Sequence, residues 1–207
     1  RLAVATREAK HVHADLEKAV AAATSAAGTA PSSKATKPTY PADFDPEIVE
    51  IITKVRPYTR TSPDKLHALI SATRYVHAHG IPGAIVECGV WRGGSMHSVA
   101  RTLDARGDHS RDLYLFDTYE GMPPPSDRDV RADGSTAADL LAKTNKSSLV
   151  WAVATLDDVR SGFEENISYP AEKIHYVVGK VEDTIPGEAP DRIAILRLDT
   201  DWYASTK

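Results

Sequence analysis

The feature of this sequence that most constrains its fold is a series of short apolar segments alternating with helical patterns. Four such segments carry mainly branched and aromatic residues, which is typical of strands. They span residues 84–88, 112–117, 173–178 and 192–198. Helical patterns lie between them at residues 95–105 and 156–166. Strands that alternate with helices form parallel sheets covered on both faces, so the sequence predicts an open, mostly parallel, Rossmann-like α/β fold.

Two further helices are predicted ahead of the first strand. One spans residues 46–55 and ends before Pro57. The other begins after Ser62, a residue type that caps helix N-termini, with Pro63 at the first helical position and Gly80 closing the helix. The buried stripe of this second helix is predicted to consist of Leu66, Leu69, Ile70, Thr73 and Val76.

The beginning of the chain has a different composition. Residues 1–40 combine an Ala-rich helical pattern with a small, polar, proline-bearing stretch. They are predicted to form an accessory helix and linker, or alternatively an arm that binds a partner. The α/β core is predicted over residues 41–207. The chain begins at Arg1 and ends at Lys207, and we expect both ends to be cuts in a longer protein.

Composition and charge narrow the class of protein. The net charge of −4 gives no general attraction to nucleic acid or to anionic membranes. No apolar run approaches the ~20 residues that a membrane-spanning helix needs, and no signal-peptide pattern is present in the sequence given. The single cysteine, Cys88, cannot form an internal disulfide, so we expect a reducing, cytoplasmic location.

Polar and glycine residues follow each predicted strand, and in a parallel sheet these positions meet at one edge, where ligands bind. Glu87 leads into a glycine-rich turn that lets a ligand approach the backbone. Asp117 ends the second strand, where a carboxylate can accept hydrogen bonds from ribose hydroxyls. The turn matches neither the G-x-G-x-x-G of dinucleotide sites nor a phosphate loop, which favours a nucleoside such as S-adenosylmethionine over NAD. The sulfonium charge of that cofactor also fits an acidic sheet edge.

Four motifs follow the strands in register: VECGVWRGGS (86–95), LYLFDTYEGMP (113–123), VVGKVEDTIP (177–186) and LRLDTDWYAST (196–206). In order and spacing they resemble the macrocin O-methyltransferase family, and YTRTSPDKL (58–66) is similar to the helix start before that family's core. The resemblance covers about residues 45–207. It implies a class I methyltransferase fold related to catechol O-methyltransferase, with S-adenosylmethionine and Mg²⁺ as cofactors.

The resemblance also implies roles for the residues at the sheet edge. The methionine part of the cofactor is expected at Glu87, Gly89 and the turn after them, and Asp117 is expected to hold the ribose. Asp199 is expected to bind the metal and to act as the base, with Asp201 close by. The remaining cofactor contacts are expected from the turn residues Trp91, Arg92, Gly93, Gly94 and Ser95, and beside the adenine from Lys180, Val181 and Glu182.

The implied reaction is methylation of a sugar hydroxyl on a glycosylated natural product, such as a macrolide or aminocoumarin antibiotic. Members of the family usually form homo-oligomers, and two further acidic metal ligands come from a later strand. The C-terminal strands of the sheet, and those ligands, are expected to be missing from this chain. Two alternatives stay open: a catechol-type enzyme that methylates a phenol, and a non-catalytic relative that binds the nucleoside.

Several residues near the predicted site have plainer interpretations. His97 and Cys88 are expected to pack in the core, and Asp183 is expected to turn the chain. Trp91 and Trp202 can equally be packing residues. The segment from Tyr119 to about Thr144 is rich in proline and charge, and is expected to form a mobile lid over the acceptor.

Overall fold

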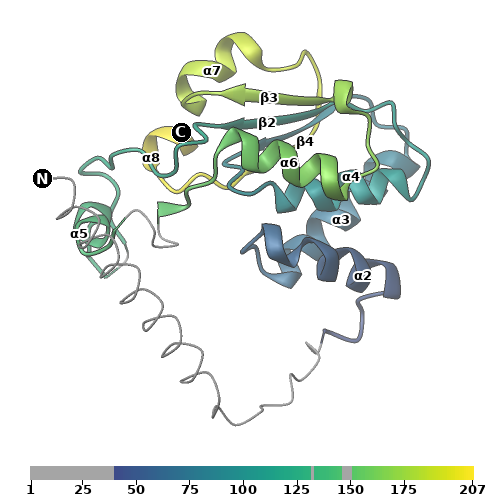
Figure 1. The fold of residues 1–207 in the computed structure, drawn as a ribbon, viewed down its shortest axis with the longest axis horizontal. Coiled ribbons are helices and arrows are strands. Elements are labelled where there is room, and N and C mark those ends of the chain that lie inside the picture. The colour runs from purple at the N-terminus through teal and green to yellow at the C-terminus, as the bar shows by residue number, and fades with distance from the viewer. Residues whose placement is uncertain (1–39, 132, 146–150) are drawn as a thin grey trace, which may run out of the picture. The chain divides into compact units, whose positions relative to one another are not determined.

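The computed structural model describes residues 40–131, 133–145 and 151–207. Their strands form one parallel sheet in the order β3-β2-β1-β4 (Figure 1). The strands are β1 (Ala84–Cys88), β2 (Leu113–Asp117), β3 (Ile174–Val178) and β4 (Ile193–Leu198). The predicted open parallel α/β sheet is confirmed, and the last three strands each begin one residue later than the sequence predicts.

The central strand is β1, which lies between β2 and β4. Val86 of β1 pairs with Tyr114 on one side and with Leu196 on the other. All five β1 residues are buried, because helices or chain segments cover both faces here. One of the five is Glu87, a carboxylate in an otherwise apolar strand. Its partners therefore matter for the site.

Three helices cover one face of the sheet: α3 (Pro63–Ala78), α4 (Gly94–Asp104) and α6 (Leu156–Asn166) (Figure 1). Side-chain caps fix where they begin. The Ser62 hydroxyl accepts the Lys65 N–H, and Thr155 and Asp158 form a reciprocal capping box. These helices and the strands form the main core, which includes Leu69, Ile85, Val99, Leu103, Leu113, Leu115, Val159 and Phe163.

The region before α3 has its own small core. Helix α2 (Pro46–Val55) is followed by a 3₁₀ turn (Arg56–Tyr58). Asp45 caps α2 by accepting the Ile48 N–H at 2.9 Å, and it also pairs with Arg74 of α3. The sequence predicts the bounds of α2 and all five residues of the α3 stripe correctly. The second core consists of Ile48, Ile51, Ile52, Val55, Leu66 and Ile70.

Helix α7 (Val181–Glu188) covers the other face of the sheet (Figure 1). Val181 packs there with Val86, Cys88 and Phe116. The sequence does not predict this helix, because its Pro186 is typical of a chain turn. The structure corrects that expectation: Asp183 lies in the first turn of α7, and Pro186 is tolerated inside a helix too short to lose much hydrogen bonding.

The remaining described elements are short: α5 (Ala137–Ala142), the 3₁₀ turn Ala171–Lys173 and α8 (Tyr203–Thr206). Within residues 40–207, apart from the gaps named above, no helix is both long and apolar enough to cross a bilayer. The helix and linker predicted over residues 1–40 lie, except for Tyr40, outside the described residues.

Candidate cofactor and acceptor site

A cavity of about 1040 Å³ lies at the carboxyl edge of the sheet. Its wall combines the ends of β1, β2 and β4, the beginning of α7, residues 59–61 before α3, and part of the segment after β2. The sheet therefore brings the predicted strand-end residues together. Nine of them line the cavity: Glu87, Gly89, Trp91, Ser95, Asp117, Lys180, Val181, Glu182 and Asp199.

Three predicted turn residues are not part of the cavity wall. Arg92 donates to the Pro57 carbonyl at 3.0 Å and lies over the Tyr58 ring. Gly93 has φ +80 and precedes the first turn of α4. A Cβ on Gly94 would lie 2.6 Å from the Tyr58 carbonyl oxygen. These residues hold the chain before α3 against the turn, and their predicted contact with the cofactor stays a prediction.

Asp117 fixes the turn after β1 in place. Its Oδ2 accepts the N–H groups of Val90 at 2.6 Å and Trp91 at 3.2 Å, and its Oδ1 accepts that of Tyr119 at 2.8 Å. Trp91 and Tyr119 both have positive φ, at 48° and 56°, so these amides stabilise a strained backbone. The Thr118 hydroxyl lies 3.5 Å from the same Oδ1. A carboxylate offers about four acceptor positions, so a ligand hydroxyl at Asp117 would take the place of this long Thr118 contact.

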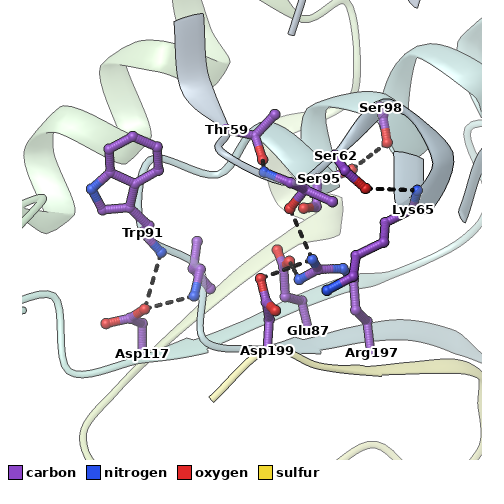
Figure 2. Close-up of polar contacts among 12 residues, drawn as sticks. Thr59, Ser62, Lys65, Glu87, Trp91, Ser95, Ser98, Asp117, Arg197 and Asp199 are labelled. Atoms are coloured by element: carbon purple, nitrogen blue, oxygen red, sulfur yellow. Dashed lines mark hydrogen bonds and ion pairs between the residues drawn. The ribbon is translucent and has the colours of Figure 1, made fainter. Parts of the chain in front are cut away.

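Arg197 joins two of the predicted acidic residues, as Figure 2 shows. Its Nη1 donates to Glu87 Oε1 at 2.5 Å, and its Nη2 donates to Asp199 Oδ2 at 2.8 Å. The same Nη2 lies 3.0 Å from the Thr61 hydroxyl. One guanidinium thus connects the end of β1, the end of β4 and the segment before α3.

The Glu87 carboxyl is the most buried charged group of the site, with 1% of its surface exposed. Burial raises the pKa of Glu87 above its ordinary value, and the guanidinium of Arg197 acts in the opposite direction. Ser95 lies near the same carboxyl and also lowers its pKa. Oε2 of Glu87 has no hydrogen-bond partner within the described residues. The site therefore contains a buried carboxylate oxygen that is open to a cationic partner.

Asp199 and Asp201 both line the cavity beyond the end of β4. The Asp199 side chain is 48% exposed and bound by Arg197. Partial desolvation raises the pKa of Asp201, and the nearby charge of Asp199 adds to the effect. In the part of the chain that the structure describes, no three His, Cys, Asp or Glu side chains are grouped to hold a metal ion. These residues alone do not fit the near-octahedral oxygen shell that Mg²⁺ requires.

The sequence does not predict two contributors to the site. Thr59, Arg60 and Thr61 line the cavity, although helix α3 separates them from the first strand along the chain. Arg197 was not expected because it lies inside a strand. A signal existed for Arg197: a guanidinium in an apolar strand needs a buried acceptor, and Glu87 is the carboxylate of another apolar strand.

The segment after β2 lies along the cavity and is tied to the residues after β4. Trp202 Nε1 donates to the Pro123 carbonyl at 2.8 Å. Asp129 accepts the Tyr203 N–H at 2.7 Å, and Arg128 lies over the Tyr203 ring. Met122, Pro123, Asp129 and Trp202 all belong to the cavity wall. The predicted lid thus has a defined place, whereas its mobility stays a prediction.

His97 and Cys88 pack in the interior, as the sequence predicts. The His97 ring lies between Tyr58 and Phe163 and is 1% exposed, and burial lowers its pKa to about 3. Cys88 is fully buried, and burial raises the pKa of its thiol to about 11. Neither group lines the cavity. Both therefore shape the fold around the turn.

Comparisons with known proteins agree with this geometry. The profile of the macrocin O-methyltransferase (TylF) family matches residues 16–207. A Streptomyces olivaceus protein, 8-demethyl-8-(2,3-dimethoxy-alpha-L-rhamnosyl)-tetracenomycin-C 4'-O-methyltransferase, is 35% identical over 79% of this chain and 60% of its own length. Demethyldecarbamoylnovobiocin O-methyltransferase of Streptomyces niveus is 32% identical over 74% of this chain and 59% of its own. The chain thus spans about 60% of the length of these curated relatives.

Two solved structures are similar to this one. The O-methyltransferase NovP aligns with a TM-score of 0.58 and 30% identity, over 72% of this chain and 58% of its own. The calicheamicin methyltransferase CalS11 aligns with a TM-score of 0.50 over 83% of this chain and 76% of its own. At 19% identity, the second likeness concerns the fold alone. Both neighbours have the methyltransferase fold that the sequence predicts.

Proposed function

Because the chain belongs to the macrocin O-methyltransferase family, we propose that the natural protein moves a methyl group from S-adenosylmethionine to a sugar hydroxyl of a glycosylated natural product. The observation that carries this proposal is one cavity that joins the turn after β1 and Asp117 to Asp199 and Asp201. It has room for a cofactor and an acceptor side by side. The relatives from Streptomyces olivaceus and Micromonospora griseorubida are named for transfer to the 4' and 3'' positions of their substrates.

The cofactor can be placed from the chemistry of the cavity wall. The ammonium of its amino-acid part meets the buried Glu87 carboxylate, which lacks a partner at Oε2. A ribose hydroxyl replaces the long Thr118 contact on Asp117, and the adenine lies against Lys180, Val181 and Glu182. Val181 is the apolar member of this group, and it lines the cavity while most of its side chain packs against the sheet. Arg92, which is exposed, and the buried Gly93 and Gly94 support the turn from the side of the chain before α3.

The methyl transfer is a displacement in which the sugar oxygen bonds to the methyl carbon and the carbon–sulfur bond breaks. The bonding electron pair stays on sulfur and leaves S-adenosylhomocysteine. The hydroxyl proton passes to a carboxylate at the acceptor side of the cavity, which we assign to Asp199 with Asp201 as its neighbour. A positioned base of this kind contributes roughly 10²–10⁴-fold to rate. Closure of the segment after β2 would hold the acceptor in line and exclude water.

Magnesium is a separate proposal. The family resemblance implies Mg²⁺ on Asp199, yet the described residues do not make a metal site on their own, and Asp199 Oδ2 is occupied by Arg197. No step above therefore depends on a metal. If Mg²⁺ takes part, its other oxygen ligands come from the acceptor or from residues beyond those described here. Assembly as a homo-oligomer and a cytoplasmic location are likewise proposals.

The test is methyl transfer by the natural protein with S-adenosylmethionine and paired acceptors. Each pair consists of a rhamnosylated polyketide or aminocoumarin and the same compound without its sugar. Mass spectrometry should show one added methyl group on the glycoside and none on the aglycone. Transfer to a phenol of the aglycone would contradict methylation of the sugar and would favour a catechol-type reaction. Cofactor binding without transfer to either would favour a non-catalytic relative.

A further inference from the structure

Neither the position of Arg197 in β4 nor the family resemblance assigns this residue a role. We propose that Arg197 is a positioning residue for the amino-acid part of the cofactor: it holds Oε1 of Glu87 and leaves Oε2 directed at the cofactor ammonium. This inference rests on the proposed function, because it assumes that S-adenosylmethionine occupies the cavity. It goes beyond that function because it assigns recognition of the cofactor ammonium to Glu87 and Arg197, which lie on the adjacent strands β1 and β4.

The register of the sheet places the pair. Arg197 of β4 is the direct neighbour of Glu87 of β1, so both side chains project from the same face of the sheet. Figure 2 shows the guanidinium beside the carboxylates of Glu87 and Asp199, with which it forms hydrogen bonds. Its further contact with the Thr61 hydroxyl fixes the plane of the group from a third direction. A planar guanidinium held at three acceptors has little freedom to turn.

The Glu87 carboxylate is satisfied on one side only. Oε1 receives the Arg197 hydrogen bond, whereas Oε2 is buried and has no partner in the described part of the chain. Buried polar atoms without partners are uncommon in folded proteins and often belong to binding sites. Glu87 also lines the cavity, next to Gly89 and Ser95. A cationic ligand group at Oε2 would complete the carboxylate without displacing Arg197.

Arg197 is thus not expected to contact the cofactor. Burial raises the pKa of the Glu87 carboxyl to about 8 even beside Arg197, so the Arg197 guanidinium and a bound ammonium would together favour the carboxylate. Without Arg197, the carboxyl loses its fixed orientation and this positive charge, and the neutral acid is favoured further. A neutral acid attracts an ammonium far less than a carboxylate does. Loss of Arg197 should therefore weaken ligands that carry the amine and spare ligands that lack it.

Three ligands distinguish the possible roles of Arg197 in the natural protein, which are positioning Glu87, binding the cofactor carboxylate directly, and supporting the fold. S-adenosylhomocysteine carries both the amine and the carboxylate, its decarboxylated analogue carries the amine alone, and 5′-methylthioadenosine carries neither. Calorimetry would compare wild type with Arg197→Met and with the more conservative Arg197→Lys. Arg111→Met is the matched control, because Arg111 likewise donates hydrogen bonds from both terminal nitrogens, here to backbone carbonyls, but lies at the opposite edge of the sheet.

We expect Arg197→Met to weaken both amine-bearing ligands by roughly 10- to 100-fold, and Arg197→Lys to have a smaller effect. Affinity for 5′-methylthioadenosine should change less than about 3-fold, and Arg111→Met should leave all three affinities unchanged. Glu87→Gln should remove the preference for the amine, and adding Arg197→Met to it should cost little more, since the two residues act as one unit.

Three results would overturn the inference. Equal weakening of all three ligands would mean that Arg197 only supports the fold. Weakening confined to S-adenosylhomocysteine would mean that Arg197 binds the cofactor carboxylate directly. Unchanged affinities in both Arg197 variants would remove any role in binding. If the wild-type protein bound none of the three ligands, the proposed function itself would fall, which is a different outcome from each of these.

Discussion

Gly89 lies so close to Asp199 that a Cβ at position 89 would be 2.5 Å from the Asp199 carbonyl oxygen. The contact joins the turn after β1 to the end of β4, and the Asp199 N–H also donates to the Cys88 carbonyl at 2.9 Å. The cofactor side and the acceptor side of the cavity are therefore one rigid unit of backbone. Gly89 has φ +87, which other residues adopt only with strain.

Substitution of Gly89 by Ala should therefore destabilise the protein and displace Asp199. We expect the free energy of unfolding to fall by about 2–4 kcal/mol, because left-handed strain and a backbone clash add together. Gly107→Ala is the control, since Gly107 has φ +64 but nothing within 4 Å of its missing Cβ. It should cost only about 1–2 kcal/mol. Urea unfolding of the two variants gives the comparison, and equal losses would contradict the role of this contact.

His97 should make stability depend on pH. Its folded pKa is lowered to about 3 by burial, from 6.5, so below pH 6.5 the unfolded chain binds a proton that the folded chain does not. Stability therefore falls as pH falls from 6.5 toward 3, by at most about 1.4 kcal/mol per pH unit. His97→Phe should lose this component. The measurement is the free energy of unfolding of wild type and His97→Phe at pH 7 and at pH 5. The value for wild type should fall relative to that of the variant at pH 5. An equal difference between the two proteins at both pH values would contradict this role of His97.

The segment after β2 should exchange amide hydrogens faster than the sheet when no acceptor is bound. The segment forms no strand of the sheet, and contacts such as the Trp202 indole on the Pro123 carbonyl tie it to the residues after β4. Trp202→Phe keeps an aromatic ring, although a smaller one, and removes the hydrogen bond, so exchange across residues 121–131 should rise further. Addition of cofactor and acceptor should slow it. Protection equal to that of β1 in the unliganded protein would exclude a mobile lid.

Much of the fold could be predicted because its signals are local. The bounds of α2 and α6 depend on caps and apolar spacing that lie within the segments themselves, such as Asp45 and Thr155. Helix α7 could not be predicted in this way. Its Pro186 is a signal for a turn, and the helix forms because Val181 packs against the sheet.

The candidate site was predictable to the extent that topology alone places it. The carboxyl ends of parallel strands share one edge, which brings Glu87, Asp117 and Asp199 to one cavity. The pairing of Glu87 with Arg197 depends instead on β4 lying beside β1 in one register, and no local pattern encodes that. The approach of Thr59 likewise depends on the missing side chain of Gly94, because a Cβ there would lie 2.6 Å from the Thr59 side chain. Helix α3 and strand β1 separate these two residues along the chain, so no local pattern shows the contact.

The role of Asp199 can be separated from that of Asp201. Asp199→Asn should lower kcat by roughly 10²–10⁴-fold, as expected for loss of a general base, and leave S-adenosylmethionine affinity within about 3-fold. Asp201→Asn is the matched variant in the same cavity and should have the smaller effect. Assays with and without EDTA test the metal. Full activity in EDTA would contradict the proposed role of Mg²⁺. Unimpaired activity of Asp199→Asn would contradict the proposed role of Asp199 as the base.

The central claim is that this cavity binds S-adenosylmethionine, and calorimetry on the natural protein tests it most directly. Asp117→Ala removes an acceptor for the ribose and the anchor of the turn after β1. Asp112→Ala, at the opposite edge of the sheet, is the control. We predict that wild type and Asp112→Ala bind the cofactor alike, and that Asp117→Ala binds it roughly 10- to 150-fold more weakly. Absence of binding to wild type, or equal affinity in Asp117→Ala, would contradict the account.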